Sequence, residues 1–337
     1  MEQMPSSPSV ANGPTNALLD SSSCGEDLLH NANRMAELAP LHCVDCADYH
    51  IRRSVQRASG VPLSIVHDRA RIISLITGFL AALPPEGRNL VNIVIPGSAD
   101  TGILATCAHA AAISGPAMLS RCKFTVVDRC RTPLMLCREF AGRYAIKLET
   151  CEGDISDPAL SFTADLVVVH SLFRFIEPAG QVNLLKTFGN WLSPGGRIIF
   201  SIAIRGGGAA DIQTDIRKHE FVNRLVGQMV TENQLNIRES RHDFAARLTR
   251  SMRSGFARPG ELRSPEEAGI LFEKAGLTAL SDELIIQKIE LDAGHAIERH
   301  RLLAVLGVTV PADKSKANQG IGPGRANERI KNPPRVS

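Results

Sequence analysis

The sequence predicts an α/β protein built on a Rossmann-like, doubly wound and mostly parallel sheet. Between residues 89 and 203, short segments that are apolar throughout alternate with segments of helical periodicity. Strands that are apolar on both sides must be covered on both faces, as in parallel sheets flanked by helices. With 337 residues, of which 44% are hydrophobic, the chain is long enough to bury such a core.

Five strands and their connecting helices account for this region. The expected strands are Val91–Ile95, Phe124–Val127, Ile146–Thr150, Asp165–Val169 and Arg197–Ala203. The connecting helices are expected at Ile103–Ile113, from Thr132 to Arg143 and from Pro178 to Trp191. Thr132 and Pro133 form a favourable N-cap and first-turn pair for the second of these helices.

Two segments precede the sheet. Residues 1–27 are rich in Ser, Pro and Asn and have no hydrophobic period, which predicts a disordered leader. Residues 28–88 are expected to be helical. The clearest helix there is His67–Leu83, whose apolar residues recur at helical spacing and pack into the core before Pro84 and Pro85 end it.

A cysteine pair lies within this helical segment. Cys43 and Cys46 have C-x-x-C spacing, with His42 and His50 on either side. A structural zinc site normally shows a second ligand pair downstream at matching spacing, and the sequence has none. A redox pair would need a thioredoxin-like strand–helix setting, which is also missing. We therefore expect reduced cysteines and no metal.

The last third of the chain is expected to form an insertion, a helix and two strands. Residues 209–260 follow three glycines and are expected to form polar helices. Ser264-Pro265-Glu266-Glu267 is a capping box that starts a helix, and Gly276 stops it. The final strands are expected at Leu284–Ile289 and Leu302–Val310, so the sheet domain spans residues 89–310 and residues 311–337 form a basic disordered tail.

Composition excludes several partners. The net charge of +3 is too small to indicate a nucleic-acid partner, and 4% aromatic residues cannot supply a stacking platform for single strands. No apolar stretch reaches membrane-spanning length, and the N-terminus lacks a secretion signal. We expect a cytoplasmic protein whose cysteines, such as Cys107, Cys122 and Cys137, are reduced core residues.

Chemistry-bearing residues follow successive strands. Ligands of an open parallel sheet bind at the carboxyl ends of the strands, where the strand order reverses. The residues there are the turn Gly97–Gly102, Asp128, Asp154 and His170. Small residues in the turn allow a ligand to approach the backbone. The carboxylate of Asp128 suits a ribose diol, and that of Asp154 suits an exocyclic amine such as that of adenine.

On these residues the chain resembles the class I S-adenosylmethionine-dependent methyltransferases. The resemblance covers about Asn89 to Val310. It rests on Ile93-Val94-Ile95-Pro96-Gly97-Ser98-Ala99-Asp100-Thr101-Gly102, Val126-Val127-Asp128, Glu152-Gly153-Asp154-Ile155, Asp165–Ser171, and Leu192-Ser193-Pro194-Gly195-Gly196-Arg197-Ile198-Ile199. The resemblance implies an antiparallel last strand, S-adenosyl-L-methionine as cofactor, and a lid formed by the N-terminal helical segment.

The resemblance also implies roles for individual residues. Gly97, Ser98 and Ala99 would approach the methionine part of the cofactor, and Asp128 would hold the ribose. Arg129 would pack near adenine, Asp154 and Ile155 would read the adenine ring, and His170 would lie near the sulfonium. The sequence departs from the family at Ile95, where an acidic residue is usual, so the amino end of the cofactor lacks its ordinary anchor.

The function expected is methyl transfer to an oxygen or nitrogen of a small molecule by in-line displacement. His170, Tyr49 and His50 are the candidate catalytic residues, whereas His242 is expected on a solvated helix face. The insertion would supply the other wall of the acceptor site, and a homodimer is expected. The alternative is a non-catalytic nucleoside- or protein-binding module on the same fold. A nicotinamide dehydrogenase fits less well because the first turn lacks a full G-x-G-x-x-G.

Overall fold

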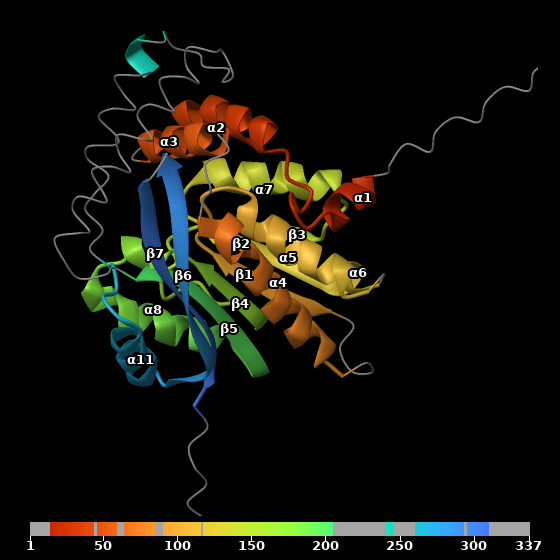
Figure 1. Cartoon of the computed structure of the whole chain (residues 1–337). Helices are drawn as coiled ribbons and strands as arrows, with labels where there is room; N and C mark the ends of the chain where they lie inside the picture. Colours follow the sequence, from red (N-terminus) through yellow and green to blue (C-terminus); the bar gives the residue numbers. More distant parts are fainter. Residues whose placement is uncertain are drawn as a thin grey trace, which may run out of the picture.

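The computed structural model describes residues 14–43, 46–58, 64–84, 90–115, 117–204, 240, 242–244, 260–292 and 295–309. At its centre lies a seven-stranded sheet of order β3-β2-β1-β4-β5-β7-β6. The strands are β1 Val91–Pro96, β2 Cys122–Asp128, β3 Leu148–Glu152, β4 Ala164–His170, β5 Leu192–Ile204, β6 Leu277–Asp292 and β7 His295–Val308. β1 to β5 pair in parallel and the last strand, β7, runs antiparallel to both neighbours, so the fold predicted from the sequence is confirmed (Figure 1).

Two hydrophobic cores cover the two faces of the sheet. The helices are α1 Pro14–Leu19, α2 Leu28–His42, α3 Ala47–Ala58, α4 Ser64–Ala81, α5 Gly102–Ile113, α6 Met118–Arg121, α7 Arg131–Arg143, α8 Pro178–Trp191 and α11 Pro265–Lys274, with the 3-10 turn η1 Phe173–Phe175. α4, α5 and α7 bury residues such as Ile72, Leu104 and Phe140 in the first core. α8 and α11 bury Phe188 and Phe272 in the second. This doubly wound arrangement leaves the carboxyl ends of β1, β2 and β4 as the natural ligand-binding edge, because the strand order reverses between β1 and β4.

The N-terminal segment is more ordered than its composition predicts. The expectation of a disordered leader through residue 27 is wrong from Pro14 onward. Leu18 is 1% exposed and joins the first core, where its carbonyl oxygen lies 2.8 Å from His109 Nδ1. The hydroxyl of Tyr144 donates to the Gly25 carbonyl oxygen at 2.7 Å. Contacts with α5 and α7, distant in sequence, therefore fix a segment that lacks a hydrophobic period of its own.

Other expectations are confirmed or adjusted locally. The predicted N-cap is confirmed, since Ser264 Oγ accepts from the Glu267 N–H at 3.2 Å, whereas the Glu267 carboxylate accepts from the Arg263 N–H at 2.6 Å and not from Ser264. The expected helix runs to Lys274 before Gly276 at φ +74°. α7 begins at Arg131 with Cys130 as N-cap rather than Thr132, and β6 and β7 extend beyond the apolar runs that predicted them. The insertion 209–260, apart from residues 240, 242–244 and 260, and the tail 311–337 lie outside the described residues. Among the described residues, no helix combines the length and the apolar character needed to cross a bilayer.

Candidate functional site

The turn after β1 forms the centre of the site. Gly97 has φ +70°, in the left-handed region that favours glycine, and its N–H donates to the Val127 carbonyl oxygen at 2.7 Å. A Cβ at this position would lie 2.7 Å from Leu172 Cδ1. The next N–H, that of Ser98, donates to Asp128 Oδ2 at 2.8 Å. These two bonds join the turn to the end of β2.

Asp128 is held by backbone groups on both of its oxygens. Besides the Ser98 bond to Oδ2, Oδ1 accepts from the Cys130 N–H at 2.7 Å. Burial raises the pKa of the carboxyl group, although these two bonds oppose the shift. A carboxylate oxygen has two lone pairs, so each oxygen keeps one acceptor position. The half-buried carboxylate is thus oriented and still able to accept from a vicinal diol.

The turn also explains the departure at Ile95. Ile95 is 1% exposed and belongs to the first core, so a carboxylate there would be buried without a partner. The nearest acidic residue in the turn is Asp100, whose oxygens accept from Arg53 Nε, Arg57 Nε, Arg57 Nη2 and the Gly102 N–H at 2.7–3.1 Å. Those four bonds use all of its acceptor positions. Asp100 therefore anchors the turn and is not available to replace the missing acid.

Burial and the arginine partners of Asp100 shift its pKa in opposite directions. Desolvation by itself raises the pKa of a carboxyl group, but the charges of Arg57 and Arg53 outweigh it and hold the pKa of Asp100 well below its usual range. The two arginines come from α3, in the predicted lid. The charge of the turn therefore depends on a helix that lies more than 40 residues earlier in the chain.

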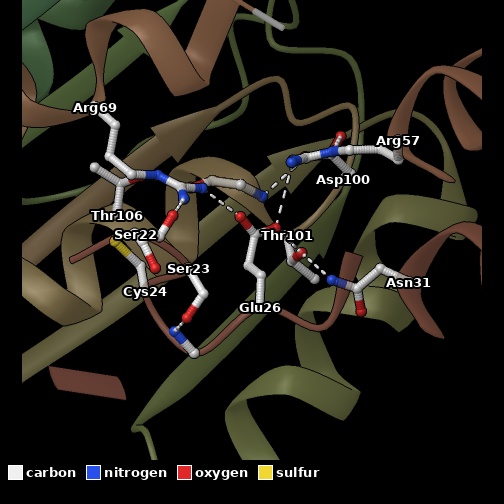
Figure 2. A network of polar contacts seen from close by, with 12 residues as sticks. Ser22, Ser23, Cys24, Glu26, Asn31, Arg57, Arg69, Asp100, Thr101 and Thr106 are labelled. Atoms are coloured by element: carbon white, nitrogen blue, oxygen red, sulfur yellow. Dashed lines mark hydrogen bonds and ion pairs between the residues drawn. The ribbon is translucent and has the colours of Figure 1, made fainter. Parts of the chain in front are cut away.

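A second carboxylate extends this network toward the leader (Figure 2). Glu26 accepts from Arg57 Nη2 at 3.4 Å and from Thr101 Oγ1 at 2.6 Å, and it pairs with Arg69 of α4. Thr101 in turn accepts from Asn31 Nδ2 of α2 at 2.9 Å. The side chain of Glu26 is fully buried. Sequence reasoning missed this network, because its members are scattered over five segments: the leader, α2, α3, α4 and the turn after β1.

His170, at the end of β4, belongs to a separate buried network of hydrogen bonds and ion pairs. Its Nε2 lies 3.2 Å from Asp68 Oδ2, which also accepts from Ser201 Oγ at 2.7 Å and from Arg301 of β7. Burial lowers the pKa of His170, and the hydrogen bond to Asp68 opposes this only in part. The following residue, Ser171, has φ +56°, an uncommon conformation outside glycine and one that recurs at functional sites. His170 is therefore neutral at pH 7 and rigidly oriented.

The other two catalytic candidates have different surroundings. The ring of Tyr49 packs edge-on against Phe175 of η1, with centroids 5.8 Å apart. Burial raises the pKa of its phenol, Arg53 opposes this, and the Asp100 and Asp128 carboxylates add to the rise, so the phenol lies within electrostatic reach of the turn. His50 is 3% exposed and lies among thiols instead. Tyr49 thus interacts electrostatically with the Asp100 and Asp128 carboxylates, whereas His50 belongs to a neighbouring cluster.

That cluster combines Cys43, Cys46 and His50 with Cys130, and their ligand atoms all lie within 4.8 Å of one another. The expectation of no metal rested on the missing second ligand pair. The structure removes that reason, because Cys130 comes from the turn after β2, far away in sequence. All eight cysteines are free, as expected, and Cys107, Cys122 and Cys137 are buried in the core.

The residues predicted to lie near adenine follow the ends of β2 and β3. Ile155 is 7% exposed in the second core, while Arg129 and Asp154 are exposed. Asp154 Oδ1 accepts from the Ser156 N–H at 2.8 Å. Ala99 is half-buried in the turn. Their contacts with a cofactor stay predictions.

Comparison with known proteins finds similarity in the backbone fold but no match in sequence. No protein-family model and no curated protein sequence matches the chain. Among solved structures, the chain is similar to the mitomycin 7-O-methyltransferase MmcR (14% identity, TM-score 0.44, covering 87% of this chain and 65% of that one). It is also similar to a putative methyltransferase from Bacillus halodurans (11% identity, TM-score 0.43, 71% and 98%). A third is the N-methyltransferase NodS from Bradyrhizobium japonicum, in complex with S-adenosyl-L-homocysteine (15% identity, TM-score 0.40, 76% and 96%).

Proposed function

We propose that this chain is an S-adenosylmethionine-dependent methyltransferase acting on an oxygen or nitrogen of a small-molecule acceptor. The observation that carries the proposal is the hydrogen bond from the Ser98 N–H to Asp128 Oδ2, which joins the ends of β1 and β2 beside the point where the strand order reverses. It joins a glycine turn to a carboxylate that keeps two acceptor positions, the combination that a nucleoside ligand requires.

The residues present fit most of this cofactor. Asp128 would accept from the ribose hydroxyls, the Gly97–Ala99 backbone would meet the methionine part, and Asp154 with Ile155 would read the adenine. The amino end lacks a carboxylate, because Ile95 is in the core and Asp100 is saturated. Arg53 uses Nε for Asp100, and we assign its terminal nitrogens to the methionine carboxylate.

The chain's own part in the transfer is orientation and control of one proton. Bound S-adenosylmethionine would supply an electrophilic methyl group. Alignment of reacting groups alone is able to lower a barrier by about 7–11 kcal/mol. Tyr49, whose phenol pKa is raised, would stay protonated and orient the acceptor as a hydrogen-bond donor. Neutral His170 would take up a proton released by a hydroxyl or ammonium acceptor.

Calorimetry with S-adenosylhomocysteine tests the proposal. We expect binding to the parent protein and a loss of about 10- to 100-fold in affinity for Asp128→Asn, since hydrogen bonds to a charged group contribute about 1.5–3 kcal/mol. Asp157→Asn is the matched control: this exposed aspartate also accepts from a backbone N–H two residues ahead, but it lies outside the site. No binding at millimolar ligand would contradict the proposal.

The saturated Asp100 favours one competing function, a non-catalytic module on the same fold. Such a module would need no anchor for the amino end of a methyl donor. In its protein-binding form, the module predicts that S-adenosylhomocysteine binding, if any, survives Asp128→Asn unchanged.

A further inference from the structure

The four-residue thiol–imidazole cluster is built from two parts of the chain. Cys43 is the C-cap of α2, Cys46 directly precedes α3, and His50 lies in the first turns of α3. Cys130 is the N-cap of α7, two residues after Asp128. The cluster thus lies where the helical segment meets the turn that holds the ribose-binding candidate.

Its dimensions match a tetrahedral metal site. Metal–thiolate bonds of about 2.3 Å in a tetrahedron place the sulfur atoms about 3.8 Å apart. Cys43 Sγ and Cys130 Sγ are 3.2 Å apart, and all four ligand atoms lie within 4.8 Å of one another. The C-x-x-C spacing of Cys43 and Cys46 is typical of zinc ligands. His50, four residues after Cys46, adds an imidazole ligand from the start of α3.

The histidine provides an independent observation. His50 is 3% exposed, and its buried Nδ1 has no hydrogen-bond partner in the part of the chain that the structure describes. A buried polar nitrogen without a partner is unfavourable, so a ligand that binds Nδ1 itself is favoured. The core cysteines Cys107 and Cys122, by contrast, are fully buried among apolar residues.

We propose that Cys43, Cys46, His50 and Cys130 form a Cys₃His site that binds one structural zinc ion. Three sulfur ligands and one nitrogen ligand suit zinc, and four protein ligands leave no open position, as in sites that stabilise a fold. Thr132 supports the site from outside, with its hydroxyl 2.9 Å from Cys43 Sγ. Zinc binding here would not require the proposed methyl transfer.

Zinc here would fasten α2 and α3 to the end of β2. The Cys130 N–H donates to Asp128 Oδ1 at 2.7 Å, so the residue that binds the metal through its side chain also orients Asp128 through its backbone. The metal would therefore hold Asp128 in position, in addition to stabilising the lid formed by α2 and α3.

Metal analysis of the intact chain tests the proposal without any methyl donor or acceptor. Mass-spectrometric elemental analysis is expected to find one zinc ion per chain. Replacement by Co²⁺ should give the visible d–d bands and thiolate charge-transfer absorption of a tetrahedral sulfur-rich site. Cys46→Ser should lower metal occupancy by more than about tenfold, whereas Cys46→His, which keeps a ligand, should retain the metal.

Cys151→Ser is the matched control, because Cys151 is half-buried, free and outside the cluster. It should leave zinc content and the cobalt spectrum unchanged. The proposal is overturned if the parent chain neither contains zinc nor gives the cobalt spectrum, a result that holds whether or not any variant folds. It is equally overturned if mass spectrometry shows a disulfide between Cys43 and Cys130, two hydrogens lighter, in protein kept under reducing conditions.

Discussion

Arg57→Met probes the buried ion network that holds the turn after β1. The side chains of Arg57, Asp100 and Glu26 are 2%, 6% and 0% exposed. Arg57 donates to Asp100 at 2.9 and 2.7 Å and to Glu26 at 3.4 Å. Methionine keeps much of the volume but leaves both carboxylates without this partner.

The expected loss of unfolding free energy depends on which ion pairs remain after the substitution. Removing one partner of a buried ion pair costs about 3–5 kcal/mol, because the remaining charge is uncompensated. Asp100 keeps Arg53, and Glu26 keeps Arg69, so we expect the lower end, about 3 kcal/mol less stable. Arg34→Met is the matched control. Its pair with Glu139 is one-third exposed, and such pairs contribute at most about 1 kcal/mol.

The assay is urea denaturation followed by circular dichroism, with both variants compared at equal slope m. A double-mutant cycle of Arg57→Met with Asp100→Asn should give a coupling of about 1–3 kcal/mol. If Arg57→Met costs no more than Arg34→Met, or if the coupling is zero, the network does not hold the turn and the reasoning is refuted.

Two further predictions concern the strand ends. Gly97→Ala should destabilise the protein by about 1–2 kcal/mol, since φ is +70° there. The double variant Gly97→Ala/Leu172→Ala removes the contact with Leu172 but keeps this backbone cost. Gly142→Ala is the control and should not destabilise, because Gly142 lies in α7 with open space around its Cβ position. The pKa of His170 is lowered from 6.5, so the unfolded chain takes up a proton that the folded chain refuses. Unfolding free energy should therefore fall as the pH drops below about 6.5, by at most about 1.4 kcal/mol per pH unit. Denaturation at pH 5–8 should show this slope reduced in His170→Gln and unchanged in His242→Gln, whose side chain is 92% exposed; an equal slope in all three proteins would contradict it.

The sheet was predictable because its information is local. Apolar strands such as Val91–Pro96 and Ala164–His170 are buried almost throughout, so each is recognisable from its own residues. The turn at Gly97 and the carboxylate of Asp128 were predictable for the same reason: each follows a strand directly, and parallel topology brings the strand ends together.

The leader and the ion networks were not predictable, because their partners are distant in sequence. Glu26 reads as part of a polar leader, yet it is buried against arginines 31 and 43 residues away. Asp68 reads as one polar position in a helix, yet its oxygen meets Arg301, 233 residues away. Buried charge is stable only when paired, and no pattern in one segment shows which other segment supplies the pair.

The Rossmann-like sheet, the turn at Gly97 and the position of Asp128 thus follow from the amino-acid order alone, since hydrophobic period and strand ends are properties of single segments. The folded chain was needed to see that Ile95 belongs to the core, that Arg53 and Arg57 saturate Asp100, and that Cys130 completes the cysteine cluster. The physical reason is that these features depend on which side chains from separate segments meet, and on the burial that makes an unpaired charge or polar nitrogen unfavourable there.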